Sequence, residues 1–169
     1  VFRDFRLIWS SQFISSVGTQ VQTVALGWLV YDITGSAALL GGIALARAIP
    51  TIFLSLFGGI LADQVDRRRL LLISQSTLAL FSALLAVAIQ IGRTDVWLLY
   101  LFAILTAAMS AVSVPTTQAF IPALVDRERL TNALTLNVLS SNFAAVLGPA
   151  LGGMIIGVLG VAAAYWLDA

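Results

Sequence analysis

Long apolar stretches dominate the sequence and limit what it can fold into. A helix needs about 20 residues to cross the roughly 30 Å hydrocarbon core of a bilayer. Five runs meet this length, at about 7–31, 38–62, 70–91, 96–120 and 132–159, and a sixth begins near 161. Only 10% of the residues are charged, against about 25% in soluble domains. We therefore predict an all-α, polytopic membrane helical bundle rather than a soluble helical bundle.

The connectors between these runs are short and carry most of the charges. Short connectors favour antiparallel neighbours. If the N-terminus is cytoplasmic, the inner segments hold Arg3, Arg6, Arg67, Arg68, Arg69, Arg127 and Arg129. The outer connectors then hold only Arg93. Cytoplasmic loops carry an excess of basic residues, so we expect a multi-pass protein of the plasma (inner) membrane with a cytoplasmic N-terminus.

Several function classes have little support in the composition. Cysteine and histidine are both absent, so the usual zinc, haem and thiol ligands are missing and we expect no metal and no cofactor. No pair of carboxylates shares a helix face at membrane depth, which disfavours an enzyme, and we expect no catalytic residue. Basic residues form no stripe with interleaved aromatics. The expected partner is the lipid bilayer, with no nucleic acid.

The first run is too polar for a passive anchor. At 100° per residue, about a third of the helix circumference holds Gln12, Ser15, Ser16, Thr19 and Thr23. Lipid offers no hydrogen-bond partner, so this face must meet protein or water. Interhelical hydrogen bonds of about 0.6 kcal/mol each are one interpretation. We favour the other, in which Gln12, Ser16, Thr19 and Thr23 line a solvated substrate path.

Arg47 is a charge deep inside an apolar run. It lies nine residues past Ala38, roughly 14 Å along the helix and near the middle of the membrane core. An arginine there costs about 2.5–3.5 kcal/mol or more, so it must face a cavity or a partner. Pro50 frees the carbonyl of Ala46. Arg47 therefore either satisfies loose carbonyls or contacts an anionic substrate or an acid elsewhere in the protein.

Small residues recur at every fourth position of the fifth run. They are Ala144, Gly148 and Gly152. Such a face lets another helix approach closely, and Pro149 adds a bend. The pattern fits static packing or a contact that slides. Asn137 and Ser141 extend the same side and are assigned to the substrate path.

The stretch "GGILADQVDRRRLLL", Gly58 to Leu72, closes the second run with an acid and three arginines. Membrane topology alone explains the arginines. It does not explain Asp63, because a negative charge at a helix C-terminus is mildly unfavourable. Asp63 therefore needs a partner. Exposed ion pairs contribute only about 0–1 kcal/mol, which suits a conformational latch that opens and closes.

This loop resembles the signature of the major facilitator superfamily, G-x-L-A-D-R-x-G-R-R/K-x-x-L. The matching residues are Gly59, Leu61, Ala62, Asp63, Arg67, Arg68 and Leu71. Gln64 and Asp66 depart from it. "GPALGG", Gly148 to Gly153, is similar to the fifth-helix signature of the superfamily's exporters, with Ala144 in place of the first glycine. "YDITGSAALLG", "DQVDRRRLL" and "PALVDRERLTNA" look like the branch of the enterobactin exporter and macrolide efflux proteins.

The resemblance implies the N-terminal six-helix half of a major facilitator fold, here as a fragment with five full helices and the start of a sixth. It also implies a secondary transporter that exports a siderophore-like or drug-like molecule by alternating access, as a proton antiporter. Asp63 and the loop arginines would stabilise the outward-facing state, and the fifth helix would pack against the C-terminal half. Arg47 favours an anionic substrate. The alternative is a non-transporting receptor or assembly partner on the same bundle.

Overall fold

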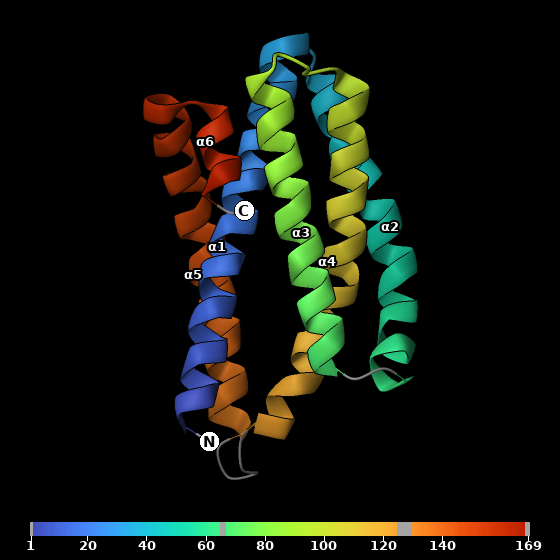
Figure 1. Ribbon diagram of the computed structural model, residues 1–169, viewed down its shortest axis with the longest axis vertical. Helices are drawn as coiled ribbons and strands as arrows, with labels where there is room; N and C mark the ends of the chain where they lie inside the picture. The colour runs from blue at the N-terminus through green and yellow to red at the C-terminus, as the bar shows by residue number, and fades with distance from the viewer. Residues whose placement is uncertain (1, 65–66, 125–129, 168–169) are drawn as a thin grey trace.

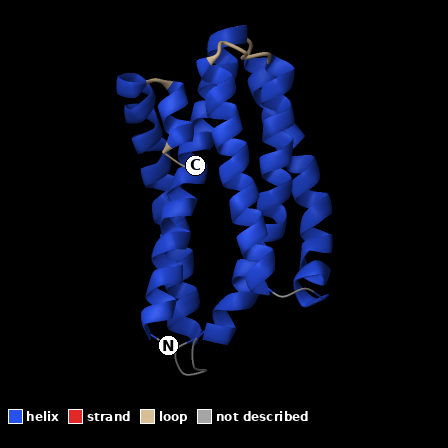
Figure 2. Cartoon of the chain, viewed as in Figure 1, coloured by secondary structure: helices blue, strands red, loops and turns tan. Residues whose placement is uncertain are grey.

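The computed structural model describes residues 2–64, 67–124 and 130–167, with side chains for 9–55, 69–118 and 130–167. The helices are α1 (Phe2–Thr34), α2 (Ala37–Gln64), α3 (Arg67–Gln90), α4 (Val96–Leu124), α5 (Leu130–Leu159) and α6 (Val161–Trp166) (Figure 1). The residues described contain no strand (Figure 2). The prediction of an all-α bundle is confirmed.

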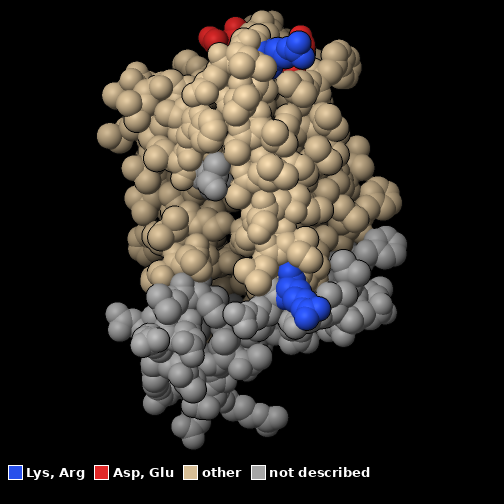
Figure 3. Space-filling model, in the orientation of Figure 1, with Lys and Arg blue, Asp and Glu red and all other residues tan. Residues whose placement is uncertain are grey.

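Five of these helices are long and apolar enough to cross a membrane. The candidate spans are Trp9–Thr34, Ala37–Ser55, Arg69–Gln90, Val96–Gln118 and Leu130–Leu159. On the face drawn in Figure 3, the charged side chains of the described residues lie at the upper end and beside the grey region below, and uncharged ones cover most of the surface between them. This distribution fits a bilayer, because the hydrocarbon core disfavours charge. The predicted polytopic membrane bundle is therefore confirmed.

The chain runs back and forth between the two ends of the bundle (Figure 1). The N-terminus and the junctions α2–α3 and α4–α5 lie at one end, which we call the N-terminal end. The junctions α1–α2, α3–α4 and α5–α6 lie at the other, called the opposite end. The most extensive packing pairs α2 with α4 and α1 with α5, while α3 lies on α4 and α6. Two parallel helix pairs therefore form the sides of the bundle.

The contact between α1 and α5 depends on the small-residue stripe. Ala144, Gly148 and Gly152 are all buried. A Cβ atom at Gly148 would collide with the Cβ of Gln20 and would lie 3.2 Å from the carbonyl oxygen of Val17. The backbone of α1 thus occupies the space that a side chain at position 148 would need. The stripe faces α1 within this bundle, so any partner in another half of the protein would meet the other faces of α5.

A tyrosine joins α2 to α4 at the opposite end. The hydroxyl of Tyr100 donates a 2.6 Å hydrogen bond to the backbone oxygen of Leu39. Gly42 lies beside this hydroxyl, and a Cβ atom there would collide with it. The bond satisfies a polar group that lipid could not. It places the aromatic ring near the end of the bundle, where membrane proteins concentrate tyrosine and tryptophan.

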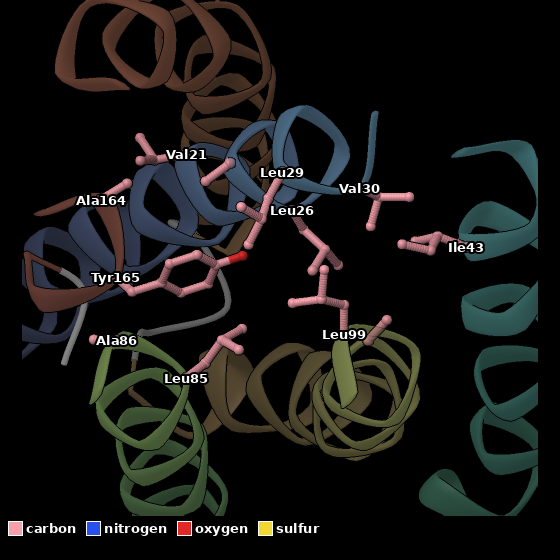
Figure 4. Packing of buried hydrophobic residues seen from close by; sticks show 12 residues of the cluster. Val21, Leu26, Leu29, Val30, Ile43, Leu85, Ala86, Leu99, Ala164 and Tyr165 are labelled. Carbon is pink, nitrogen blue, oxygen red and sulfur yellow. The ribbon is translucent and has the colours of Figure 1, made fainter. Parts of the chain in front are cut away.

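The buried apolar core lies toward the opposite end (Figure 4). Leu26 and Val30 of α1 meet Leu85 of α3 and Leu99 of α4, and Ile43 joins them from α2. Tyr165 of α6 inserts between α1 and α3 (Figure 4). The larger cavity described below reaches this core, since Leu26, Leu85 and Tyr165 belong to the core and also line the cavity. Toward the N-terminal end, α1 and α3 are separated by the cavities described below.

Gly148→Ala should destabilise the protein, although alanine is the better helix former by about 1 kcal/mol. The new methyl group would push α5 away from Gln20 and Val17, and overpacking typically costs about 1–3 kcal/mol. The matched control is Gly153→Ala, because a Cβ at Gly153 meets no atom within 4 Å. Thermal unfolding in detergent should show a lower midpoint for the first variant alone. Equal midpoints for the two variants would contradict the close α1–α5 contact.

Candidate functional site

A larger cavity, with a volume of about 470 Å³, lies between α1 and α3. Polar side chains of α1 line it, among them Ser15, Thr19, Gln22 and Thr23. Arg47 of α2, Gln75 of α3 and Tyr165 of α6 also line this cavity. The volume is in the range of small-molecule sites, about 300–1,000 Å³. The site combines one cation with several neutral hydrogen-bonding groups.

Arg47 reaches across to α1. It is half-buried, and its Nη1 donates a 3.1 Å hydrogen bond to Oγ1 of Thr23. A guanidinium has five N–H donors. Among the described residues, Thr23 is the one hydrogen-bond partner of the Arg47 side chain. Several donors therefore remain for water or an anion in the cavity.

Three hydroxyl groups of α1 can act toward the cavity as acceptors rather than donors. Ser16, Thr19 and Thr23 donate to the backbone oxygens four residues earlier, at 2.8, 2.9 and 2.8 Å. Each hydroxyl proton is thus used within the helix, and the oxygen lone pairs stay free to accept. Thr23 uses one of them for Arg47. This arrangement stabilises the cation without neutralising its charge.

The smaller cavity has a volume of about 230 Å³ and adjoins the larger one. Gln12, Ser16, Gln20 and Ser141 contribute to its lining. Both cavities are also lined by Ser15, Thr19, Gln75, Leu78 and Ser110. The polar side of α1 therefore borders a continuous space, which extends from Gln12 near the N-terminal end to Thr23 beside Arg47.

The structure brings most of the predicted path residues together. Gln12, Ser16, Thr19, Thr23, Arg47 and Ser141 line one cavity or both. Asn137 is half-buried on α5 and lines neither of these two cavities. In the fifth-helix motif, Ala144 borders the smaller cavity. Pro149 and Gly153 are exposed on α5.

The predicted latch loop lies outside the residues whose side chains are described. Gly59 and Asp63 belong to the last turns of α2, and Arg67 and Arg68 begin α3. The pairing of Asp63 with an arginine therefore stays a prediction.

A second polar cluster joins three helices and was not expected from the sequence. Nε2 of Gln22 donates to Oγ of Ser82 at 2.7 Å, and Ser82 donates to the backbone oxygen of Tyr165 at 2.7 Å. The Tyr165 hydroxyl lies 3.5 Å from the backbone oxygen of Gln22. The cluster holds α6 against α1 and α3. The spacing of seven residues between Gln75 and Ser82 was the available signal in α3, whereas an isolated tyrosine in an apolar run gives none.

Comparison with known proteins identifies the family. The family described as "Transmembrane secretion effector" matches residues 2–169. The chain belongs to this family of the major facilitator superfamily. It is 30% identical over 154 residues to the staphyloferrin A transporter of Staphylococcus aureus, which covers 90% of this chain and 39% of the relative. It is 28% identical over 166 residues to the enterobactin exporter EntS of Shigella boydii, which covers 98% of this chain and 40% of the relative.

A third relative has a similar degree of identity. The enterobactin exporter EntS of Salmonella typhimurium is also 28% identical over 166 residues. The chain spans about two fifths of the length of these relatives. No solved structure matches the chain. The predicted resemblance to the major facilitator superfamily and its siderophore exporters is confirmed, and the chain is multi-pass.

Single cysteines at Thr19 and Thr23 should react with a water-soluble thiol reagent, because both positions line the larger cavity. The matched control is Ala25→Cys on the same helix, which should stay unmodified because Ala25 is fully buried. This chain contains no cysteine of its own, and any cysteine elsewhere in the transporter would be replaced first. Labelling is measured by mass shift in intact membranes. Inert cysteines at both positions would mean that the space is dry.

Proposed function

We propose that the chain forms the N-terminal half of a secondary transporter that exports a small organic anion of the siderophore class. Two findings support this proposal. The relatives include an enterobactin exporter and a staphyloferrin A transporter. The two adjoining cavities follow the polar side of α1 and contain the guanidinium of Arg47.

Arg47 is the observation that carries the proposal. It lies within the candidate span Ala37–Ser55 and is half-buried. A charge at this depth is expensive unless water, a partner or a ligand stabilises it. Its described partner is the neutral hydroxyl of Thr23, and none of the described side chains that line the two cavities is a carboxylate. The described part of the site therefore carries a positive charge that an anionic substrate would balance.

Alternating access is the mechanism that we assign to this transporter. The buried core lies toward the opposite end and the smaller cavity toward the N-terminal end, so the bundle is unequal along the membrane normal. A rigid bundle of this shape, rocking against a second one, would expose a midplane site to either side in turn. We assign proton coupling to groups other than the described lining residues, because none of these is an acid. The arginine distribution supports a cytoplasmic N-terminus.

Arg47→Gln in the full-length transporter should lower kcat/KM for anionic siderophores by roughly 10- to 100-fold. This is the loss expected for hydrogen bonds to a charged group. Arg47→Lys should be intermediate, because lysine keeps the charge but lacks the planar fork. Transport of enterobactin and staphyloferrin A into everted vesicles is the measurement. An equal loss for a cationic dye would assign Arg47 a structural role, and wild-type vesicles that transport neither siderophore would refute the proposed function.

Asp63→Asn should reduce the transport rate and leave the amount of protein in the membrane unchanged. The acid is proposed to latch one conformation, and its amide analogue cannot form an ion pair. The matched control is Asp66→Asn in the same loop, where the family signature has no acid. Initial transport rates normalised to expression are compared for the two variants. Normal transport by Asp63→Asn would remove the latch from the mechanism.

A further inference from the structure

Two side-chain bridges cross the gap between α1 and α3. These helices are not close packing neighbours, since α1 lies mainly on α5 and α3 on α4 and α6. Ser15 bonds to Gln75 and Gln22 bonds to Ser82, and the two pairs are each separated by 60 residues in sequence. Along both helices the bridges are seven residues apart, about 10 Å. The two bridges occupy equivalent positions along the helices, but their hydrogen bonds differ in length and in burial.

The bridge at the opposite end is structural. Its donor–acceptor distance is 2.7 Å, and Ser82 is 2% exposed. Ser82 in turn donates to the backbone oxygen of Tyr165. Every group in this bridge is held by at least one neighbour, so it fixes α1, α3 and α6 relative to one another.

The bridge nearer the N-terminal end is built differently. The distance from Ser15 Oγ to Gln75 Oε1 is 3.4 Å, at the upper end for a hydrogen bond. Gln75 is half-buried and lines both cavities. Within the described residues, its amide nitrogen donates no hydrogen bond. Whichever way the amide is turned, one end meets Ser15 and the other remains available to the cavity.

We propose that Gln75 is a specificity-determining residue that binds a neutral oxygen of the substrate, while Arg47 binds its anionic group. This inference rests on the proposed function. The partners of the two side chains, Ser15 and Thr23, are eight residues apart on α1, about 12 Å along the axis. We take this spacing of the two partners as the scale of the substrate, so the inferred substrate class is an elongated, oxygen-rich anion with a carbonyl or hydroxyl group remote from its charge. A short anion is then expected to engage Arg47 alone.

A purely structural role for Gln75 fits the geometry less well. A glutamine that only joined two helices would be expected to form a short, buried bond, as Gln22 does with Ser82. Leucine or methionine would fill the same volume without bringing an amide into the membrane. Gln75 instead lines the cavity that Arg47 also lines, and one end of its amide has no hydrogen bond within the described residues. Polar groups in such a position discriminate between ligands, because a ligand without the matching group leaves them unpaired.

The test uses the full-length transporter in everted vesicles, with enterobactin and staphyloferrin A as substrates and succinate as a short competing anion. Gln75→Met keeps the side-chain length and removes the amide. It should raise KM for the transported siderophore about tenfold, as expected for one lost hydrogen bond. Inhibition by succinate should not change. Gln75→Asn should recover part of the affinity.

Ser82→Ala is the matched control, because it removes the other bridge. It should lower the thermal unfolding midpoint and leave KM unchanged. The opposite pattern for Gln75→Met, a normal midpoint with a raised KM, supports the inference. A lowered midpoint with an unchanged KM would make Gln75 a structural residue and overturn it. That result would leave the proposed function intact if Arg47→Gln still impaired siderophore transport.

A second measurement covers the case in which Gln75→Met does not fold. Gln75→Cys, with any other cysteine of the transporter replaced, should react with a water-soluble thiol reagent. Added siderophore should slow the reaction at least severalfold, and succinate should not. A cysteine that never reacts would mean that the gap is filled, and one that no siderophore protects would mean that the substrate does not reach it. Either result overturns the inference.

Discussion

The absence of hydrogen-bond partners in lipid determines how this bundle is arranged. Polar groups on α1 and the guanidinium of Arg47 cannot face hydrocarbon, so they turn toward the interior. Apolar residues cannot close that interior completely, because the polar groups require partners or water. Arg47 and Thr23 solve part of the problem with one hydrogen bond. The remaining polar surface keeps α1 and α3 apart and leaves a cavity between them.

The bundle joins its helices in two different ways. Toward the opposite end, large apolar residues and Tyr165 pack into a buried core. Along α5, small residues allow the backbone of α1 to approach closely without interlocking side chains. One region is therefore firmly fixed, while the other is smooth. Such a combination suits a half-transporter that moves as one body and still keeps an internal opening.

The sequence predicts those features that depend on one residue at a time. Apolar length identifies the spans, and the charge of Arg47 reveals an interior site, because each carries a large transfer free energy. The stripe of small residues on α5 can also be recognised in the sequence, as a repeat of four residues. The sequence does not show which helix packs against it. The roles of Gln75 and Tyr165 cannot be predicted in this way, because they depend on which helices become neighbours. Asn137 is a residue for which the sequence predicts too much. It lies on the same side of α5 as Ser141, but it lines neither cavity.

A neutral amide at position 75 makes physical sense beside a single buried cation. A second arginine would double the cost of desolvation and bind simple inorganic anions tightly. An acid would pair with the cation and neutralise the site. Glutamine avoids both outcomes, because it offers a donor and an acceptor without charge. The site can then attract an anion through Arg47 and distinguish among anions by the groups that they carry elsewhere. Length and oxygen content, rather than charge alone, become the basis of selection.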